Sequence, residues 1–259
     1  MALRSIWNGT ISFGLVKVPI KLYSATEPKG IAFREIHVKD NSLLQHRRVC
    51  KAEGREVDRS EIAKGYEVRP DQYVVLESDE VKAAAGERPK TIEIEEFVDV
   101  EAIDPFYFNK SYFMGVRDVD EPYALLVAAL RDSGKAGIGR FTFHNREYLV
   151  ALHAEEDRLV LHTLRYAEEI IEPGDLDLPD GGKKPTRKEV ELARRLVEGL
   201  TEDFDPGEYQ DEYRASVMDL IERKAEGKKP KKKRARKREE TGDLSKALEK
   251  SLAAQGSRS

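Results

Sequence analysis

The stretch from Trp7 to Tyr23 constrains the fold of this chain more than any other. Apolar and polar residues alternate along it, and the parity of the alternation changes between Leu15 and Val16. Period-two alternation rich in β-branched and aromatic residues is typical of a β-strand. A change of parity just after Gly14 predicts a bulge or bend, as in a strongly curved sheet or barrel. An ordinary edge strand, which Pro19 permits, is the alternative. The two apolar sets are Ile11, Phe13 and Leu15, and Val16, Val18, Ile20 and Leu22.

The rest of the chain predicts a mixed α and β protein. Further strands are expected at 32–38, 72–76, 91–100 and 106–116, and as a meander at 138–143, 147–153 and 159–164. Helices are expected at 78–85 with Ser78 as N-cap, at 120–133 with Asp120 as N-cap, after the capping box Thr186–Glu189, at 205–224, and at 243–253. The buried stripe of the second helix is expected to be Tyr123, Leu126, Val127 and Leu130.

Composition narrows the class of protein. The 259 residues suffice for one large domain with appendages or for two modest domains. We find neither a run of eighteen apolar residues nor a secretory signal. The single cysteine, Cys50, cannot form an internal disulfide. These features predict a cytoplasmic protein without a membrane span.

Charge is distributed unevenly along the chain. The formal net charge is −4, which by itself argues against a nucleic-acid-binding protein. A run near the C-terminus nevertheless contains nine basic residues and no acidic one; they are Lys228, Lys229, Lys231, Lys232, Lys233, Arg234, Arg236, Lys237 and Arg238. The remaining chain has 36 basic and 49 acidic residues, a net charge of −13. An acidic body of this kind can contact a polyanion only through a local basic cluster.

One segment of the body, from Ile31 to Arg69, has weak periodicity and many bases. It is too polar for a core and too rich in apolar and aromatic residues to be disordered. An extended arm or ribbon lying over a partner fits this composition, and a solvated charged loop is the alternative. The bases are Arg34, Lys39, Arg47, Arg48, Lys51, Arg55, Arg59, Lys64 and Arg69.

A search for catalytic or metal-binding motifs finds none that is specific. The chain lacks a phosphate-binding loop and a nucleophile elbow. The histidines at 144, 153 and 162 recur at nine-residue intervals, which a meander produces by coincidence and a metal cluster only rarely. Asp175, Asp177 and Asp180 lack the downstream glutamate of a calcium loop. Glu93 and Glu95 share a strand face that exposure explains. We therefore expect no enzyme, no cofactor and no metal site.

Without a catalytic motif, a binding function is the expectation. The basic segment 31–69 carries the residue types that contact nucleic-acid phosphates. Reading a sequence would require a recognition helix or finger aimed at base edges, and none is evident. The expected contact with DNA is sensitive to salt and indifferent to sequence.

These residues, taken in order, resemble the bacterial Ku proteins, the DNA-end-binding factors of non-homologous end joining. The similarity runs from near the N-terminus to about Lys224. The stretches that carry it are Ile6–Val16 with Val18–Tyr23, Arg47–Cys50, Lys64–Glu67 with Gln72–Leu76, Ile94–Val98, Thr163–Ala167, and Phe204–Pro206 with Asp211–Tyr213.

The resemblance implies a mixed α+β fold with a β-barrel core, an extended bridge arm and C-terminal helices. It implies a ring-shaped homodimer that holds a double-stranded DNA end by its backbone, bridges and protects broken ends, and recruits an ATP-dependent, often multifunctional, DNA ligase in a cytoplasmic, nucleoid-associated setting. The expected divisions are a core at 1–184 with the arm at about 30–69, a helical region at 185–226, and a basic tail at 227–259.

The resemblance also assigns residues. The candidates for phosphate contact in the arm are Arg34, Lys39, Arg47, Arg48, Lys51, Arg55 and Lys64, and weaker candidates outside it are Lys135 and Arg140. The tail adds the nine residues of its basic run as DNA-binding candidates, and the alternative is that the tail serves only solubility. The ligase-docking candidates are Tyr209, Tyr213, Val217 and Leu220, for which packing against the preceding helix is the alternative. Many bacterial relatives have a second cysteine shortly after the position of Cys50; here 51–54 contain none.

Two other classes of function stay open. One is a general architectural nucleic-acid-binding protein that acts through its tail. The other is a hydrolase or nuclease that uses scattered carboxylates.

Overall fold

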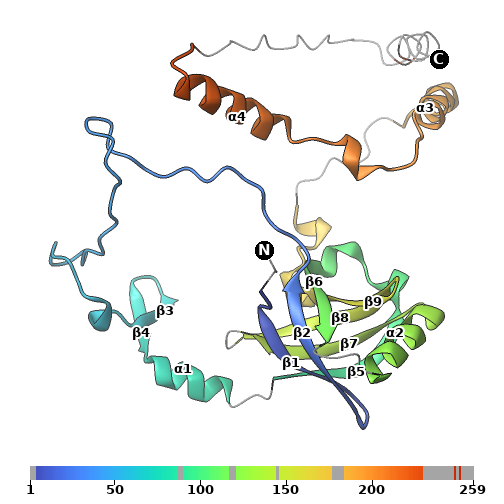
Figure 1. The fold of residues 1–259 in the computed structure, drawn as a ribbon, viewed down its shortest axis with the longest axis horizontal. Coiled ribbons are helices and arrows are strands. Elements are labelled where there is room, and N and C mark those ends of the chain that lie inside the picture. The colour runs from blue at the N-terminus through green and yellow to red at the C-terminus, as the bar shows by residue number, and fades with distance from the viewer. Residues whose placement is uncertain are drawn as a thin grey trace. The chain divides into compact units, whose positions relative to one another are not determined.

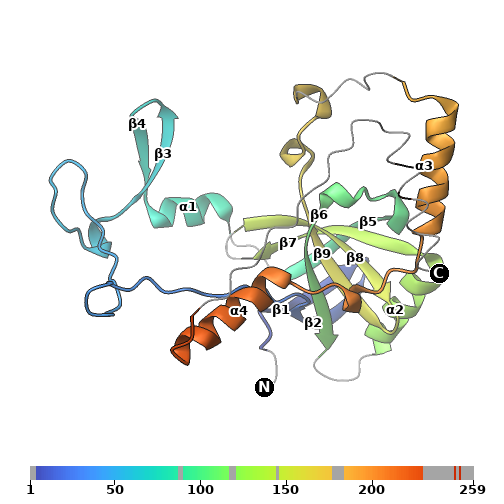
Figure 2. The ribbon, with the colours of Figure 1, turned by 90° about the horizontal axis from the view of Figure 1, so that it is seen from above.

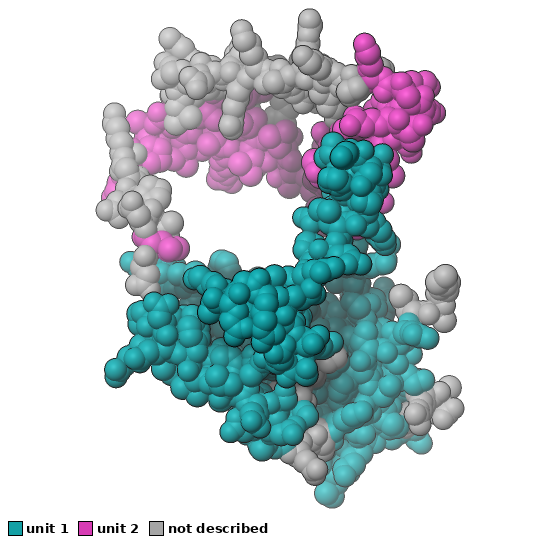
Figure 3. Space-filling model, turned by 90° about the vertical axis from the view of Figure 1, so that its left-hand side faces the viewer, with its two compact units in different colours: residues 1–29, 33–175 teal, residues 30–32, 176–259 magenta. Residues whose placement is uncertain are grey.

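The computed structural model describes residues 4–86, 90–116, 121–143, 146–176 and 184–229, together with Leu248 and Ser251. The chain divides into two compact units, which Figure 3 shows in different colours. Unit 1 comprises residues 1–29 and 33–175, and unit 2 comprises residues 30–32 and 176–259. Each is described by itself.

Unit 1 contains the strands and two of the helices (Figure 1). The strands are β1 (Trp7–Phe13), β2 (Val16–Ser24), β3 (Lys64–Arg69), β4 (Gln72–Leu76), β5 (Thr91–Asp99), β6 (Phe108–Val116), β7 (Lys135–Phe143), β8 (Arg146–Glu155) and β9 (Arg158–Leu164). The helices are α1 (Ser78–Ala85) and α2 (Glu121–Ser133). Unit 2 contains α3 (Arg187–Gly199) and α4 (Glu212–Ala225).

Seven of the strands form a closed barrel in the order β1-β2-β6-β9-β8-β7-β5. Neighbouring strands are antiparallel except at the closure, where β5 runs parallel to β1. Closure leaves no exposed strand edge, which suits a barrel that folds from short antiparallel hairpins. The expected mixed fold with a barrel core and a β7–β8–β9 meander is confirmed.

The change of parity near Gly14 marks a hairpin, not the bulge or bend that the sequence led us to expect. β1 and β2 pair with Phe13 opposite Val16, so Gly14 and Leu15 form a two-residue loop. Gly14 has φ +57, as the first position of such a turn often requires. A two-residue reversal lets both apolar sets face the core, and this explains the change of parity. Leu15, expected in the first set, is at the turn and is exposed.

The barrel is curved by irregularities in two other strands. The pairing of β5 with β7 shifts between Ile94 and Glu96, and that of β6 with β9 shifts between Phe108 and Lys110. Bulges of this kind increase the bend and twist of a strand. At the second shift the buried Thr163 hydroxyl accepts a hydrogen bond from the Lys110 N–H at 3.1 Å, which satisfies a group that the ladder leaves unpaired.

The core fills the barrel and continues under α2. Leu126, Val127 and Leu130 are buried in one cluster with inward-facing strand residues, and Tyr123 packs against it, as the helical spacing predicted. The Tyr123 hydroxyl donates to the Met114 carbonyl at 2.8 Å and accepts from the Leu159 N–H at 3.0 Å. One side chain thus fastens α2 to β6 and β9. The helix is followed by Gly134 with φ +63, an expected stop signal.

Several element boundaries differ from expectation. Residues 32–38 form no strand and make only the isolated bridge Ile36–Leu43, whereas β3 was missed. The N-cap of α1 is Glu77, one residue before Ser78. The helix expected from Asp205 begins only at Glu212, because Pro206–Glu208 form a single 3-10 turn and the Asp211 carboxylate caps α4.

The other helix predictions divide in two. The Thr186 capping box at the start of α3 is confirmed. The described residues do not include the expected N-cap Asp120 or most of the expected helix 243–253. They also do not include Asp177 and Asp180, which were considered above as part of a calcium loop.

Within the described part of the chain, no helix combines the length and the apolar character needed to cross a membrane.

Candidate nucleic-acid interface

The arm, residues 30–69, is built from successive local turns. In the first, Ile36 bridges to Leu43, and the Asp40 carboxylate accepts hydrogen bonds from the Ser42 N–H at 3.0 Å and hydroxyl at 2.7 Å. These bonds, the backbone one first, lower the pKa of Asp40. Asn41 takes the positive φ of 57° that the reversal needs. The turn is thus held by polar contacts among residues 35–44, without a core.

The second turn surrounds Cys50. Val49 bridges to Glu56, the Cys50 N–H donates to the Arg55 carbonyl at 2.9 Å, and Gly54 closes the loop with φ +69. The backbone N–H groups of Glu53 and then Ala52 lower the pKa of the Cys50 thiol. Hydrogen bonding to the thiolate makes this cysteine more acidic than a free one.

The arm ends in β3, which pairs with β4 as a two-stranded antiparallel ribbon (Figure 2). Asp71, with φ +61, forms its turn, and its N–H donates to the Glu67 carboxylate at 3.0 Å. All residues of β3 are exposed, as are those of β4 except Leu76. An isolated hairpin without a buried face is marginally stable in water, so this ribbon needs a partner surface.

The predicted arm cations fall into two groups. Arg47 pairs with Glu56 at 2.9 Å, and Arg55 pairs with Glu61 at 2.9 Å as well as with Glu53. The others make no ion pair with any described residue and are exposed; they are Arg34, Lys39, Arg48, Lys51 and Lys64, joined by Arg59 and Arg69. A cation without a carboxylate neighbour can neutralise an external phosphate without first losing an internal bond.

Apolar side chains accompany these cations, and their exposure was not predicted from the sequence. Phe33 is 68% exposed and Val38 is 92% exposed. The others are Ile36, Leu43, Leu44, Val49, Ile62, Tyr66, Val68, Tyr73, Val74 and Val75. Such a density of exposed apolar residues marks an interaction surface. The available signal was the richness in apolar residues of a segment without core periodicity.

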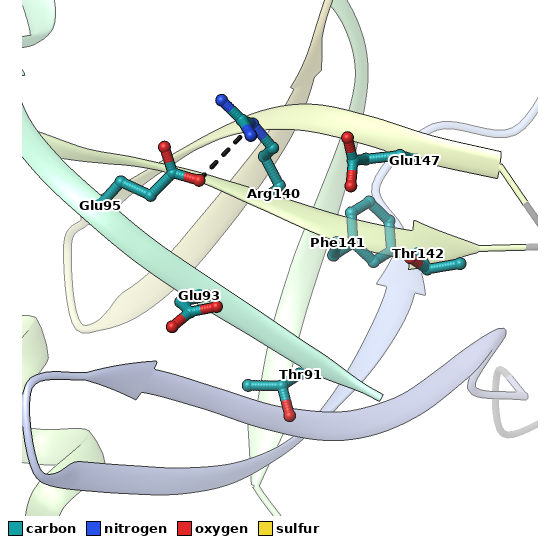
Figure 4. A pocket seen from close by; sticks show the side chains of 7 residues that line it. All are labelled: Thr91, Glu93, Glu95, Arg140, Phe141, Thr142 and Glu147. Carbon is teal, nitrogen blue, oxygen red and sulfur yellow. Dashed lines mark ion pairs between the residues drawn. The ribbon is translucent and has the colours of Figure 1, made fainter. Parts of the chain in front are cut away.

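The two weaker candidates lie on the barrel beside carboxylates. The Lys135 ammonium pairs with Asp99 at 2.7 Å. The Arg140 guanidinium reaches Glu95 at 3.5 Å across a pocket of about 200 Å³ that Glu93 and Glu147 also line (Figure 4). Three carboxylates in one pocket oppose the approach of a phosphate. We therefore rank Lys135 and Arg140 below the unpaired cations of the arm.

The C-terminal candidates are only partly described. Lys228 and Lys229 are exposed, and Lys228 pairs with Glu226 at 2.8 Å. The remaining tail candidates, residues 231–238, lie outside the described residues.

The ligase-docking candidates of unit 2 are not brought together on one helix. Tyr213, Val217 and Leu220 lie on α4, with the tyrosine exposed and the other two half-buried. Tyr209 precedes the helix and packs against Phe204, with ring centroids 5.6 Å apart. Its contribution to the docking surface stays a prediction.

The meander histidines form a pair. His153 and His162 stack with their Nε2 atoms 2.9 Å apart, and His162 Nδ1 lies 2.8 Å from the Ser111 hydroxyl. Burial first, and His153 second, lower the pKa of His162. His144 lies outside the described residues. Among the described residues, no group of three or more His, Cys, Asp or Glu side chains is placed to hold a metal ion.

Comparison with known proteins identifies the family to which this chain belongs. The family model described as the Ku70/Ku80 beta-barrel domain matches residues 12–192. The chain is 40% identical to the Non-homologous end joining protein Ku of Solibacter usitatus over 250 residues, 96% of this chain and 93% of that protein. It is 36% identical to the protein of the same name from Bacillus subtilis over 256 residues, 96% of this chain and 82% of that protein. The chain belongs to the Ku family of non-homologous end joining proteins.

Proposed function

We propose that this protein binds the ends of double-stranded DNA without reading their sequence, as a homodimer whose two arms enclose the duplex. The observation that carries the proposal is the arm, an extended segment whose exposed cations are mostly unpaired. Its cations recur along successive turns and not on a recognition helix. Spaced cations contact phosphates, and phosphate contacts carry no sequence information.

The exposed apolar residues of the arm support a homodimer. A DNA backbone offers little to cover valine, phenylalanine or leucine side chains, whereas a second copy of the chain does. Tyr66 and Tyr73, both exposed on the β3–β4 ribbon, are of the type that dominates protein interfaces. The cations would then face the duplex while the apolar side chains hold the two chains together.

We infer a scaffolding role in which bound ends are protected and bridged and an ATP-dependent DNA ligase is recruited. The helical region at 185–226 is the docking candidate, because α4 presents Tyr213 beside Val217 and Leu220. The basic tail at 227–259 would add affinity for DNA without adding specificity. The role that we propose involves binding and no catalytic turnover.

The test compares linear DNA with closed circular DNA of one sequence at moderate salt. A ring that loads at ends binds the linear form and is trapped when both ends are blocked after loading. Arg48→Glu with Lys51→Glu, which changes two unpaired arm cations, should reduce binding to linear DNA by at least about tenfold, or 1.4 kcal/mol.

The matched control is Lys17→Glu with Lys110→Glu, which makes the same change of charge on exposed barrel residues outside the arm. This variant should retain end binding within about threefold, by the same conversion of free energy to affinity. Equal affinity of the natural protein for linear and circular DNA would contradict loading at ends. Equal losses in the two double variants would contradict the assignment of phosphate contacts to the arm.

A further inference from the structure

Helix α3 of unit 2 has an apolar stripe that its own unit leaves largely open. None of its residues is buried, and Val190 and Val197 are 52% and 66% exposed. With Pro185 and Ala193 they line a groove of about 510 Å³. An amphipathic helix with an uncovered stripe gains free energy when another apolar surface packs against it.

The charged residues of this groove are already engaged by their own helix. The Glu189 carboxylate accepts the Thr186 N–H at 2.7 Å in the capping box, and Arg194 pairs with Glu198 at 2.8 Å. The remaining lining is apolar, so the groove favours an apolar occupant over a charged one.

The remaining lining residue, Leu248, comes from the C-terminal segment of the same chain. It is half-buried there. In the sequence it is flanked at four-residue spacing by Leu244 and Leu252. Leucines at i, i+4 and i+8 share one face of a helix, which is the pattern by which an amphipathic helix fills a groove.

We propose that residues 244–252 dock through these leucines into the α3 groove of their own chain. In the sequence, Leu248 is separated from the end of α4 by the 22 residues 226–247, which contain the basic run.

Docking within one chain is favoured over docking between chains by the tether. A random coil of 22 residues has an end-to-end distance of roughly 25 Å, and tethers of this length give effective concentrations on the order of millimolar. A second chain at micromolar concentration competes poorly with a segment already tethered to the groove. A three-leucine contact too weak to hold a separate peptide is therefore sufficient.

Cross-linking of the full chain tests the contact. In a Cys50→Ser background, Val197→Cys with Leu248→Cys should be joined by a short bis-maleimide within one chain. Arg195→Cys with Leu248→Cys is the matched control, because residue 195 is on α3 but does not line the groove. Mixing tagged and untagged chains distinguishes cross-links within one chain from cross-links between two chains. Equal yields in both pairs, or products only between chains, would overturn the proposal.

Hydrogen exchange of α3 provides a readout that is independent of DNA. Leu248→Asp should speed exchange of the α3 amides by roughly tenfold, because it removes one apolar anchor from the groove. Lys250→Asp, which lies between the leucine positions in the sequence, should change exchange by less than about twofold on the same free-energy scale. Unchanged α3 exchange in Leu248→Asp would contradict docking whether or not the protein binds DNA ends.

Discussion

Gly139 lies where two strands approach too closely for any side chain. A Cβ atom built at this position would be 2.1 Å from the Glu93 carbonyl oxygen, beside the bulge of β5. We expect Gly139→Ala to lower the free energy of unfolding by about 1–3 kcal/mol, because backbone must shift to admit the methyl group. Urea unfolding followed by circular dichroism measures this change.

Gly30→Ala is the control for that substitution, since a Cβ at position 30 meets no atom within 4 Å and the residue has no positive φ. Its unfolding midpoint should equal or slightly exceed that of the natural protein. Equal destabilisation by both substitutions would contradict the close approach of the two strands at Gly139.

The His153–His162 pair predicts a dependence of barrel stability on pH. The pKa of His162 is lowered below its ordinary value of 6.5, mainly by burial, so the folded barrel binds this proton less readily than the unfolded chain does. The contribution of neutral His162 to the free energy of unfolding is therefore complete above about pH 6.5. It is lost as the pH falls through the pKa of His162 in the folded protein.

Urea midpoints measured from pH 7.5 down to pH 5 check this prediction. His162→Gln should flatten the acid side of the profile, because glutamine cannot acquire a charge beside His153. A profile identical to that of the natural protein would assign the pH dependence to other groups.

Residue patterns in the sequence predicted which side chains fill the core better than which ones approach each other. Leu126, Val127 and Leu130 follow from helical spacing and a single face, which are local properties. The pairing of Arg47 with Glu56, by contrast, depends on a turn around Cys50 whose geometry no local periodicity encodes. Contacts between residues that a turn brings together were therefore accessible only from the structure.

At the scale of elements, the β1–β2 hairpin and the β3–β4 ribbon show why boundaries were harder to predict than element types. A two-residue turn reverses the chain and switches parity, so a hairpin without a strong turn dipeptide reads like one bent strand. β3 (Lys64–Arg69) escaped detection because Tyr66 and Val68 alternate with polar residues over only four positions. An alternation this short within a highly charged segment is not distinguished from a charged loop by its sequence.

The β3–β4 ribbon carries a prediction about self-association. Tyr66→Ser with Tyr73→Ser removes two exposed aromatic side chains from its surface. If a second copy covers the ribbon, the variant should dissociate at protein concentrations at least about tenfold higher than the natural protein does, since interface tyrosines contribute strongly to binding. Sedimentation velocity over a concentration series measures this.

Leu125→Ser on α2 is the matched control, because Leu125 is similarly exposed but lies outside the arm. This variant should associate like the natural protein, and all three proteins should unfold at similar urea concentrations. An unchanged dissociation constant in the tyrosine variant would separate the ribbon from the dimer interface.

At the scale of the whole molecule, the distribution of charge decides where the chain can contact DNA, and the net charge does not. The body is acidic, and on the barrel Lys135 and Arg140 lie against carboxylates, whereas most cations of the arm make no ion pair with a described residue. Sequence alone located the basic segment and the barrel core. It could not show which cations are neutralised by their own chain, because pairing depends on distances between side chains.

Deleting the chain after Gly227 separates the arm from the tail as the source of DNA affinity. The deletion removes twelve basic residues, nine of them in the basic run, and each phosphate contact contributes about 0.9 to the slope of log affinity against log salt concentration. We expect a shallower slope and weaker binding overall, with the preference for linear over circular DNA retained, because the arm supplies that preference. Titrations at several salt concentrations with both DNA forms measure slope and preference together. If the deletion abolished binding to both forms, the protein would act as a general nucleic-acid binder through its tail, and the enclosing arm would have no role in holding DNA ends.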